Sequence, residues 1–265
     1  MVNRPAQALL WSEEFTDHHD GQLPEDTWNY DLGDGASAGL IGWGNNELEY
    51  YTKDSVSINE NLVISASKQS ANSGLMCYYG PAQWTSGKIH TGGKIGFKYG
   101  RIEIRAKMPS GVGTWPALWL LGKNLLDGVA WPHCGEIDIL ETTGKNPFQV
   151  QGTIHGDGYS GEHGLTEIVQ SPTELSKDFH TYAINWTEDK IEWSFDGRRY
   201  KTISKNDTDA IGKLWPFNQE FYLVINLAIG GWFAGEVDPD LEDAALEIAS
   251  IRYYSIDGIG ELILH

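Results

Sequence analysis

The chain has 265 residues, a formal net charge of −18, two cysteines, 31 glycines, 11 tryptophans and 12 tyrosines. Such a negative charge repels a phosphate backbone and an anionic membrane surface, so neither nucleic acid nor membrane is an expected partner. Abundant glycine and aromatic residues with little helical periodicity predict an all-β chain of strands joined by tight turns.

No linker, low-complexity segment or internal repeat divides the sequence, so we expect one domain over residues 1–265, acting as a monomer. Residues 1–7 are polar and are expected to lie outside the fold, either disordered or added for expression. They do not resemble a signal peptide, which fits a cytosolic protein or one whose leader has been removed. Cys77 and Cys134 match neither a disulfide framework nor a metal cluster, and we expect two buried free thiols.

The first expected strand covers residues 9–15, and turn-rich sequence follows it. Segment 42–52 then combines two glycines, which allow positive φ, with Asn45 and Asn46. Their side-chain amides can both donate and accept hydrogen bonds, as hydroxyl recognition requires. Taken alone, the segment is explained more simply as an Asn-rich turn.

Short strands are expected over 54–66, about a turn at 59–61, and over 84–97. Residues 100–108 alternate apolar with charged side chains, which predicts a strand with one charged face. Such a row of charged side chains usually forms a strand face exposed to solvent. Arg105, which belongs to it, is also a candidate for contacting a sugar hydroxyl or a catalytic carboxylate.

Segment 115–121 carries Trp115 and Trp119 four residues apart, and therefore on one face of a strand. An indole face packs well against the apolar face of a pyranose ring, although core packing is the competing use of any single tryptophan. Two tryptophans on one face, shortly before an acidic strand, favour a sugar-binding platform.

Residues 136–141 place three carboxylates within six residues. Glu136 and Asp138 share one face of a strand, but a regular pleat would turn Glu141 into the core. A β-bulge around Leu140 would return Glu141 to the face of the other two. Such close anions resist simultaneous ionisation, so at least one should hold a proton near neutral pH. Two carboxyl groups about 5 Å apart are what a retaining glycosidase uses as nucleophile and acid.

The rest of the chain adds strands and a few candidate residues. His155 ends the next expected strand, 152–155, although lone histidines are more often structural. A short helix is expected to begin at 171–174. Segment 221–229 should bury its leucines and isoleucines and leave Asn226 on the other face, with Trp232 just beyond its end.

Further strands are expected over 180–186, 190–195, 198–203 and 246–254. The second and third of these are joined by Asp196-Gly197, a hairpin signal. Strands recurring about every ten residues favour a two-sheet β-sandwich.

The chain resembles the bacterial laminarinases of glycoside hydrolase family 16 over nearly its whole length. The resemblance is carried by the order and spacing of the segments 11–15, 42–52, 99–108, 115–121, 136–141, 152–155 and 217–232. The extra residue between Asp138 and Glu141 is similar to the laminarinase branch of the family, whereas the lichenase branch lacks it.

The resemblance implies a jelly roll with an open cleft on its concave sheet, and retaining endo-hydrolysis of β-1,3-glucan without a catalytic metal or other cofactor. It implies that Glu136 is the nucleophile, Glu141 the acid/base, and Asp138 the group between them that tunes both. Because glucan polymers lie outside cells, it also implies a secreted protein. The positions that it places along the cleft are Asn45, Arg105, Trp115, Trp119, His155, Asn226 and Trp232.

Many family members also bind a structural calcium through an acidic residue in the last strand. Here Ala249 and Ser250 precede Ile251-Arg252-Tyr253, so we expect that site to be absent or weakened, with Glu13 or Glu14 as the remaining ligands. Mixed-linkage β-1,3-1,4-glucan is left open as a second substrate. The alternatives are a galactan hydrolase of the agarase or carrageenase type and a non-catalytic β-glucan-recognition module.

Overall fold

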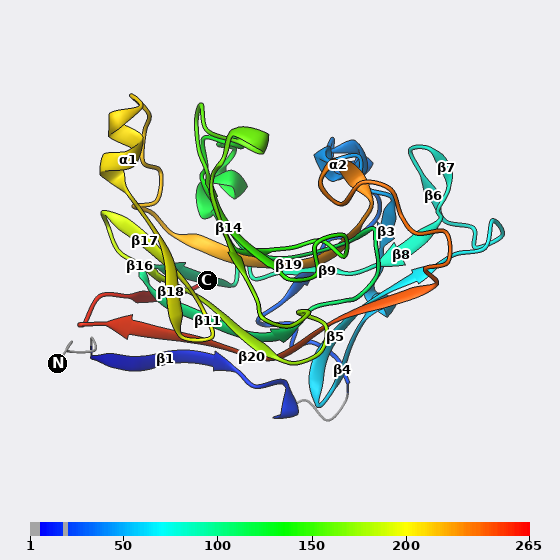
Figure 1. Cartoon of the computed structure of the whole chain (residues 1–265), viewed down its shortest axis with the longest axis horizontal. Coiled ribbons are helices and arrows are strands. Elements are labelled where there is room, and N and C mark those ends of the chain that lie inside the picture. Colours follow the sequence, from blue (N-terminus) through cyan, green and yellow to red (C-terminus); the bar gives the residue numbers. More distant parts are fainter. Residues whose placement is uncertain (1–5, 18–20) are drawn as a thin grey trace.

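The computed structural model describes residues 6–17 and 21–265 and has two large, mostly antiparallel sheets packed face to face (Figure 1). We call them the front sheet, which carries β13 (Glu136–Glu141) and β14 (Gln149–His155), and the back sheet, which carries β11 (Gly100–Lys107) and β20 (Asp243–Ile256). In Figure 1, β14 and β19 (Phe221–Ile229) of the front sheet lie above β20 and β1 (Gln7–Glu13) of the back sheet. The predicted two-sheet sandwich is therefore confirmed.

The front sheet runs in the order β15 (Leu165–Gln170), β14 (Gln149–His155), β13 (Glu136–Glu141), β12 (Thr114–Gly122), β19 (Phe221–Ile229), β10 (Ile95–Lys98) and β21 (Glu261–Leu264), with β9 (Lys88–His90) on β19 and β2 (Asn29–Tyr30) on β9.

The back sheet runs in the order β18 (Arg198–Ser204), β17 (Lys190–Phe195), β16 (His180–Trp186), β11 (Gly100–Lys107), β20 (Asp243–Ile256), β5 (Asn61–Lys68), β8 (Trp84–Ser86) and β3 (Glu49–Tyr51), with β1 (Gln7–Glu13) on β20 and β4 (Val56–Asn59) on β5.

Smaller elements complete the described part of the chain. They are the hairpin of β6 (Met76–Cys77) and β7 (Gly80–Pro81), the helices α1 (Lys205–Ala210) and α2 (Gly231–Ala234), and the 3-10 turns η1 (Phe15–Asp17), η2 (Ala36–Ala38), η3 (Ile41–Gly44), η4 (Lys53–Ser55), η5 (Lys123–Asp127) and η6 (Gly161–His163).

The core fills the space between the sheets because each strand turns alternate residues inward. In β11 the inward residues are Ile102, Ile104 and Ala106, and in β12 they include Leu118 and Leu120, all of them fully or almost fully buried. Period-two alternation therefore leaves the intervening positions of the front sheet free to line a cleft.

The predicted bulge in β13 is confirmed. Leu140 pairs with Leu118 of β12 and Asp138 pairs with Trp119, which leaves Ile139 as the extra residue. On the other side, Asp138 and Glu141 pair with positions only two apart on β14. Both Ile139 and Leu140 are buried, so the extra residue is taken up on the core side and Glu141 returns to the outer face.

Two expectations about local structure are wrong. Residues 171–174 begin no helix. The Thr173 amide donates to the Ser171 hydroxyl and the Leu175 amide donates to the Pro147 main-chain oxygen, and these hydrogen bonds hold the segment as a turn. Gln7 already belongs to β1 and pairs with Ile256, so it is part of the fold. Residues 1–5, also expected outside the fold, lie beyond the described residues.

Cys77 and Cys134 are both buried and free, as predicted. Within the described ranges, no helix is long and apolar enough to cross a bilayer.

Trp193 connects the two sheets at β13. It is fully buried in β17, and its indole N–H donates to the main-chain oxygen of Asp138 at 2.8 Å. We expect Trp193→Phe to lower the free energy of unfolding by about 2–3 kcal/mol, through the lost hydrogen bond and the cavity left behind. Urea unfolding measures this loss. Trp232→Phe is the matched control, because Trp232 is 76% exposed and should leave stability unchanged.

Candidate active site

Three carboxylates lie together on the outer face of the front sheet. Glu136, Asp138 and Glu141 all come from β13, and the bulge places Glu141 on the side of the other two. Asp138 is only 2% exposed, whereas Glu136 and Glu141 are partly exposed. The two outer groups are therefore open to a ligand, while the middle one supports them from below.

Each outer carboxyl accepts a hydrogen bond from an indole. Trp115 Nε1 donates to Glu141 Oε1 at 3.0 Å, and Trp131 Nε1 donates to Glu136 Oε2 at 2.8 Å. An indole N–H can only donate, so each bond favours an oxygen that carries negative charge. Local sequence patterns did not indicate Trp131, although it stands five residues before Glu136 in a Trp-Pro pair.

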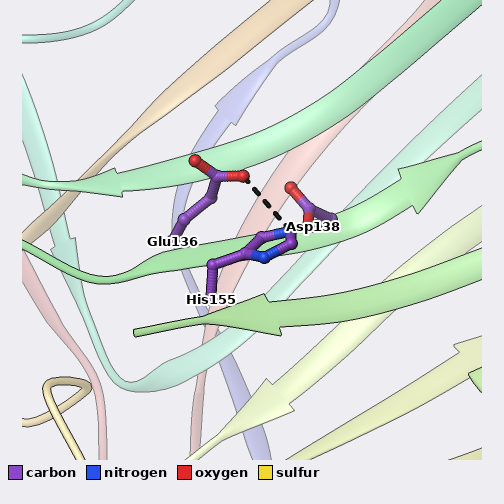
Figure 2. A group of neighbouring side chains, drawn as sticks. All are labelled: Glu136, Asp138 and His155. Atoms are coloured by element: carbon purple, nitrogen blue, oxygen red, sulfur yellow. Dashed lines mark ion pairs between the residues drawn. The ribbon is translucent and has the colours of Figure 1, made fainter. Parts of the chain in front are cut away.

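His155 lies directly across the ladder from Glu136, as β14 pairs with β13 (Figure 2). Its Nε2 is 3.1 Å from Asp138 Oδ2 and 3.6 Å from Glu136 Oε1, and the ring is buried. The predicted proximity of His155 to the carboxylates is therefore observed. The imidazole faces two of the three acids and offsets part of their negative charge.

The carboxylates are strongly perturbed. Burial raises the pKa of Glu136, Asp138 and Glu141 to about 8 each. The Asp138 charge raises the pKa of the two outer groups further, whereas His155 and the indole donors lower it. Because these acids share one small space, they titrate together, and the cluster retains protons near neutral pH. A protonated acid beside an ionised carboxylate is a combination suited to acid-assisted nucleophilic attack.

The floor beside the carboxylates is aromatic and amide-rich. Trp115 and Trp119 lie on the same face of β12, as predicted, and both are partly exposed. Trp119 Nε1 donates to Asn226 Oδ1 at 2.8 Å, and Asn226 Nδ2 donates to the hydroxyl of Tyr51 at 3.1 Å. Asn226 is therefore brought to the cleft face and held there by two hydrogen bonds.

Asn45 and Trp232 meet beside Trp115. The Trp232 amide donates to the Asn45 main-chain oxygen at 2.9 Å, and the neighbouring Phe233 packs edge-on against Trp115, with ring centroids 5.2 Å apart. Trp232 projects outward and is 76% exposed. Six of the seven residues expected along the cleft are thus gathered around the carboxylates.

The seventh, Arg105, is a correction. It lies on β11 of the back sheet, on the face opposite to the buried Ile104, and is exposed. Its guanidinium stacks over Phe179 at 5.2 Å and donates to the Phe179 main-chain oxygen. The whole thickness of the sandwich separates this face from β13, so Arg105 does not line the cleft.

One donor set has the spacing of a metal site: ligand atoms of Glu136, Asp138 and His155 lie within 4.8 Å of one another. The same three side chains are explained by acid–base chemistry, which needs the carboxylates free. Glu13 and Glu14, which remained as candidate calcium ligands from the sequence, lie elsewhere. Glu13 is buried, and Glu14 forms a two-pronged ion pair with Arg252, at 2.6 and 3.0 Å.

The chain is similar to known proteins over most of its length. Residues 43–249 match glycosyl hydrolases family 16. The chain is 37% identical to a beta-glucanase of Rhodothermus marinus, over 94% of this chain and 86% of that protein. The catalytic domain of an endo-1,3-beta-glucanase (laminarinase) from Thermotoga petrophila RKU-1 matches with a TM-score of 0.89 at 41% identity, over 95% of this chain and 99% of that one. An endo-beta-1,3-glucanase from Pyrococcus furiosus matches with a TM-score of 0.88 at 37% identity, over 95% of each chain.

The raised carboxyl pKa values predict how stability changes with pH. The pKa of Glu136 is about 8 in the folded chain against an ordinary value of 4.5. Between these values the folded state holds a proton that the unfolded state has lost. The contribution of Glu136 to stability is therefore complete below pH 4.5 and is lost as pH rises through about 8.

Glu136→Gln should accordingly raise the unfolding temperature at pH 8 and change it little near pH 4.5. Each kcal/mol recovered corresponds to about 2–4 °C. Thermal unfolding followed at both pH values gives the answer. Glu162→Gln, at a side chain that is 89% exposed, is the control and should show no such gain. An equal shift for Glu136→Gln at the two pH values would contradict the prediction.

Proposed function

The chain belongs to glycosyl hydrolases family 16, and on that premise we propose that it hydrolyses internal β-1,3-glucosidic bonds of laminarin-type glucans with retention of configuration. One observation carries the proposal. Three perturbed carboxylates share the outer face of β13, directly beside two tryptophans on the neighbouring strand. Mixed-linkage β-1,3-1,4-glucan is the second substrate to test, because the platform packs against sugar rings whatever bond joins them.

Glu136 attacks the anomeric carbon in the first step, and the glycosidic bond breaks as a covalent glycosyl-enzyme forms. Glu141 gives its proton to the leaving oxygen in the same step. Glu141 then removes a proton from water, and the water oxygen displaces Glu136 to release the sugar with its original configuration. Trp131 and His155 fit the nucleophile's role, since a hydrogen bond from the first and the charge of the second stabilise ionised Glu136.

Asp138 links the two halves of this cycle. It lies 3.1 Å from His155 Nε2, and its charge raises the pKa of both Glu136 and Glu141. When Asp138 is protonated, it stabilises ionised Glu136. When Asp138 is ionised, its negative charge disfavours loss of the proton from Glu141. One buried carboxyl is thus coupled electrostatically to the protonation of both outer groups.

A neutral polymer suits the cleft. The side chains gathered around the carboxylates are indoles and amides, which bind sugar faces and hydroxyl groups without needing a charge on the ligand. The cleft's parts all come from one chain, so we propose that the protein acts as a monomer. Because glucan polymers lie outside cells, we also propose extracellular action.

Product analysis on laminarin, curdlan and barley β-glucan tests the proposal. Purified protein should release oligosaccharides of several sizes from laminarin, and early NMR spectra should show the β-anomer of the new reducing end first. Glu136→Gln should bind laminarin but lose turnover by a factor of at least about 10³, because no nucleophile remains. The proposal fails if laminarin is untouched, if the α-anomer appears first, or if Glu136→Gln retains substantial turnover.

Trp131→Phe tests the indole bond to the nucleophile. The substitution keeps an aromatic ring but removes the N–H that binds Glu136. We expect kcat on laminarin to fall about tenfold, as the loss of one hydrogen bond to a charged group predicts. Trp131 is 44% exposed, so thermal stability should remain close to that of wild type. An unchanged kcat would show that Glu136 is positioned without Trp131.

A further inference from the structure

A second acid pair lies beneath the cleft, apart from the three carboxylates of β13. Glu47 and Glu49 are buried, and Glu49 has no exposed surface. The two carboxyl groups act on each other electrostatically, since the charge of Glu47 raises the pKa of Glu49. Burying two acids side by side is costly unless one is neutral and the pair is well hydrogen-bonded, so such a pair points to a role beyond packing.

The hydrogen bonds around Glu47 run in one direction, and the indole of Trp119 fixes it. That indole can only donate, so the atom of Asn226 that faces it is the oxygen, and the Asn226 amide N–H is left to donate to the Tyr51 oxygen. The Tyr51 proton is then free for Glu47 Oε2, at 3.2 Å. A series of hydrogen bonds that begins at a donor-only group must end at an acceptor, and Glu47 is that acceptor.

Asn45 donates to the other oxygen of the same carboxyl, Nδ2 to Glu47 Oε1 at 2.9 Å. With a donor on each oxygen, Glu47 has the surroundings of a carboxylate ion. The positive charge of Lys88 also lowers the Glu47 pKa, although burial leaves that pKa raised. Lys88 Nζ lies 4.0 Å above the Trp43 ring and 5.4 Å from the Trp119 ring, at the edge of the same floor.

Glu49 has the opposite surroundings. Its Oε2 accepts the Ile229 amide at 2.7 Å, and its buried Oε1 has no hydrogen-bond partner among the described residues. Burial, followed by the charge of Glu47, raises the Glu49 pKa well above its ordinary value. The proton of the pair therefore belongs on Glu49, where it faces Glu47.

We propose that Glu47 is a positioning residue: as the ionised member of a Glu47–Glu49 pair sharing one proton, it orients Asn45 and Asn226 to bind glucan hydroxyls. This inference rests on the proposed glucanase function. Asn45 and Asn226 come from different parts of the fold, a loop before β3 and the centre of β19, and Glu47 is the point at which their hydrogen bonds converge. Their amide orientations are set from below, before any substrate arrives.

The decisive experiment compares Glu49→Gln with Glu47→Gln. Glutamine has the shape of a protonated glutamate: at position 49 it can still donate to Glu47 and accept the Ile229 amide, so kcat and KM on laminarin should stay within about twofold of wild type. At position 47 the new NH₂ group opposes a donor, either Asn45 or Tyr51. We expect KM to rise about tenfold, with kcat changed less than about threefold, because one or two binding amides are misdirected.

Tyr51→Phe keeps the test decisive if Glu47→Gln does not fold. It removes only the hydroxyl between Asn226 and Glu47, so KM should again rise more than kcat falls. The proposal is overturned if Glu49→Gln raises KM as much as Glu47→Gln, or if Glu47→Gln or Tyr51→Phe leaves KM unchanged. A purely structural pair would lower the unfolding temperature in both glutamine variants without separating KM from kcat.

An infrared measurement separates this inference from the proposed function. At about pH 9.5, above the pKa near 8 of the β13 carboxylates, wild type should retain a protonated-carboxyl band that Glu49→Gln lacks. If wild type does not cleave laminarin but the band behaves this way, the substrate assignment fails and the shared proton stands. If laminarin is cleaved and the band is absent from wild type, the glucanase stands and the acid pair does not share a proton.

Discussion

The bulge in β13 is the constraint on which the site depends. A strand has only two faces, and the six residues from Glu136 to Glu141 must supply both a core layer and three carboxylates. The extra residue at Ile139 lets Leu140 stay in the core opposite Leu118 while Glu141 returns to the surface. Without it, a carboxylate would enter an apolar core at a cost of several kcal/mol.

The second constraint is electrostatic. Placing anions together in a poorly solvated cleft raises their pKa values, and the protein stabilises only those charges that the chemistry needs. The carboxyl groups of Glu136 and Glu141 each accept one indole N–H, whereas the indole of Trp193 reaches only the main-chain oxygen of Asp138. The Glu47–Glu49 pair follows the same rule, with two donors on Glu47 and a proton on Glu49. In both clusters, a hydrogen-bond donor on a carboxyl oxygen favours the ionised form of that carboxyl group.

The aromatic residues serve two purposes at once. Trp115 and Trp119 offer ring surface to the cleft while their N–H groups orient Glu141 and Asn226. A sugar platform and a charge-setting donor are therefore combined in one side chain. Trp193 also has two roles: it fills the core, and its indole N–H donates to the main-chain oxygen of Asp138 from the opposite sheet.

Local patterns in the sequence determined many of the strands, their faces and the carboxylates of the candidate site. The alternation in 100–108, 115–121 and 221–229 predicted strands and their faces, because side-chain direction repeats every two residues whatever the strand pairs with. The spacing of Glu136, Asp138 and Glu141 demanded a bulge for the same reason. Pairing between distant strands, by contrast, is decided only by the folded chain. Arg105 was misplaced because alternation shows which residues share a face, but not which sheet the strand joins. Trp131, Glu47 and Glu49 were missed for a related reason: their roles arise from partners on other segments, and no local period brings those segments together.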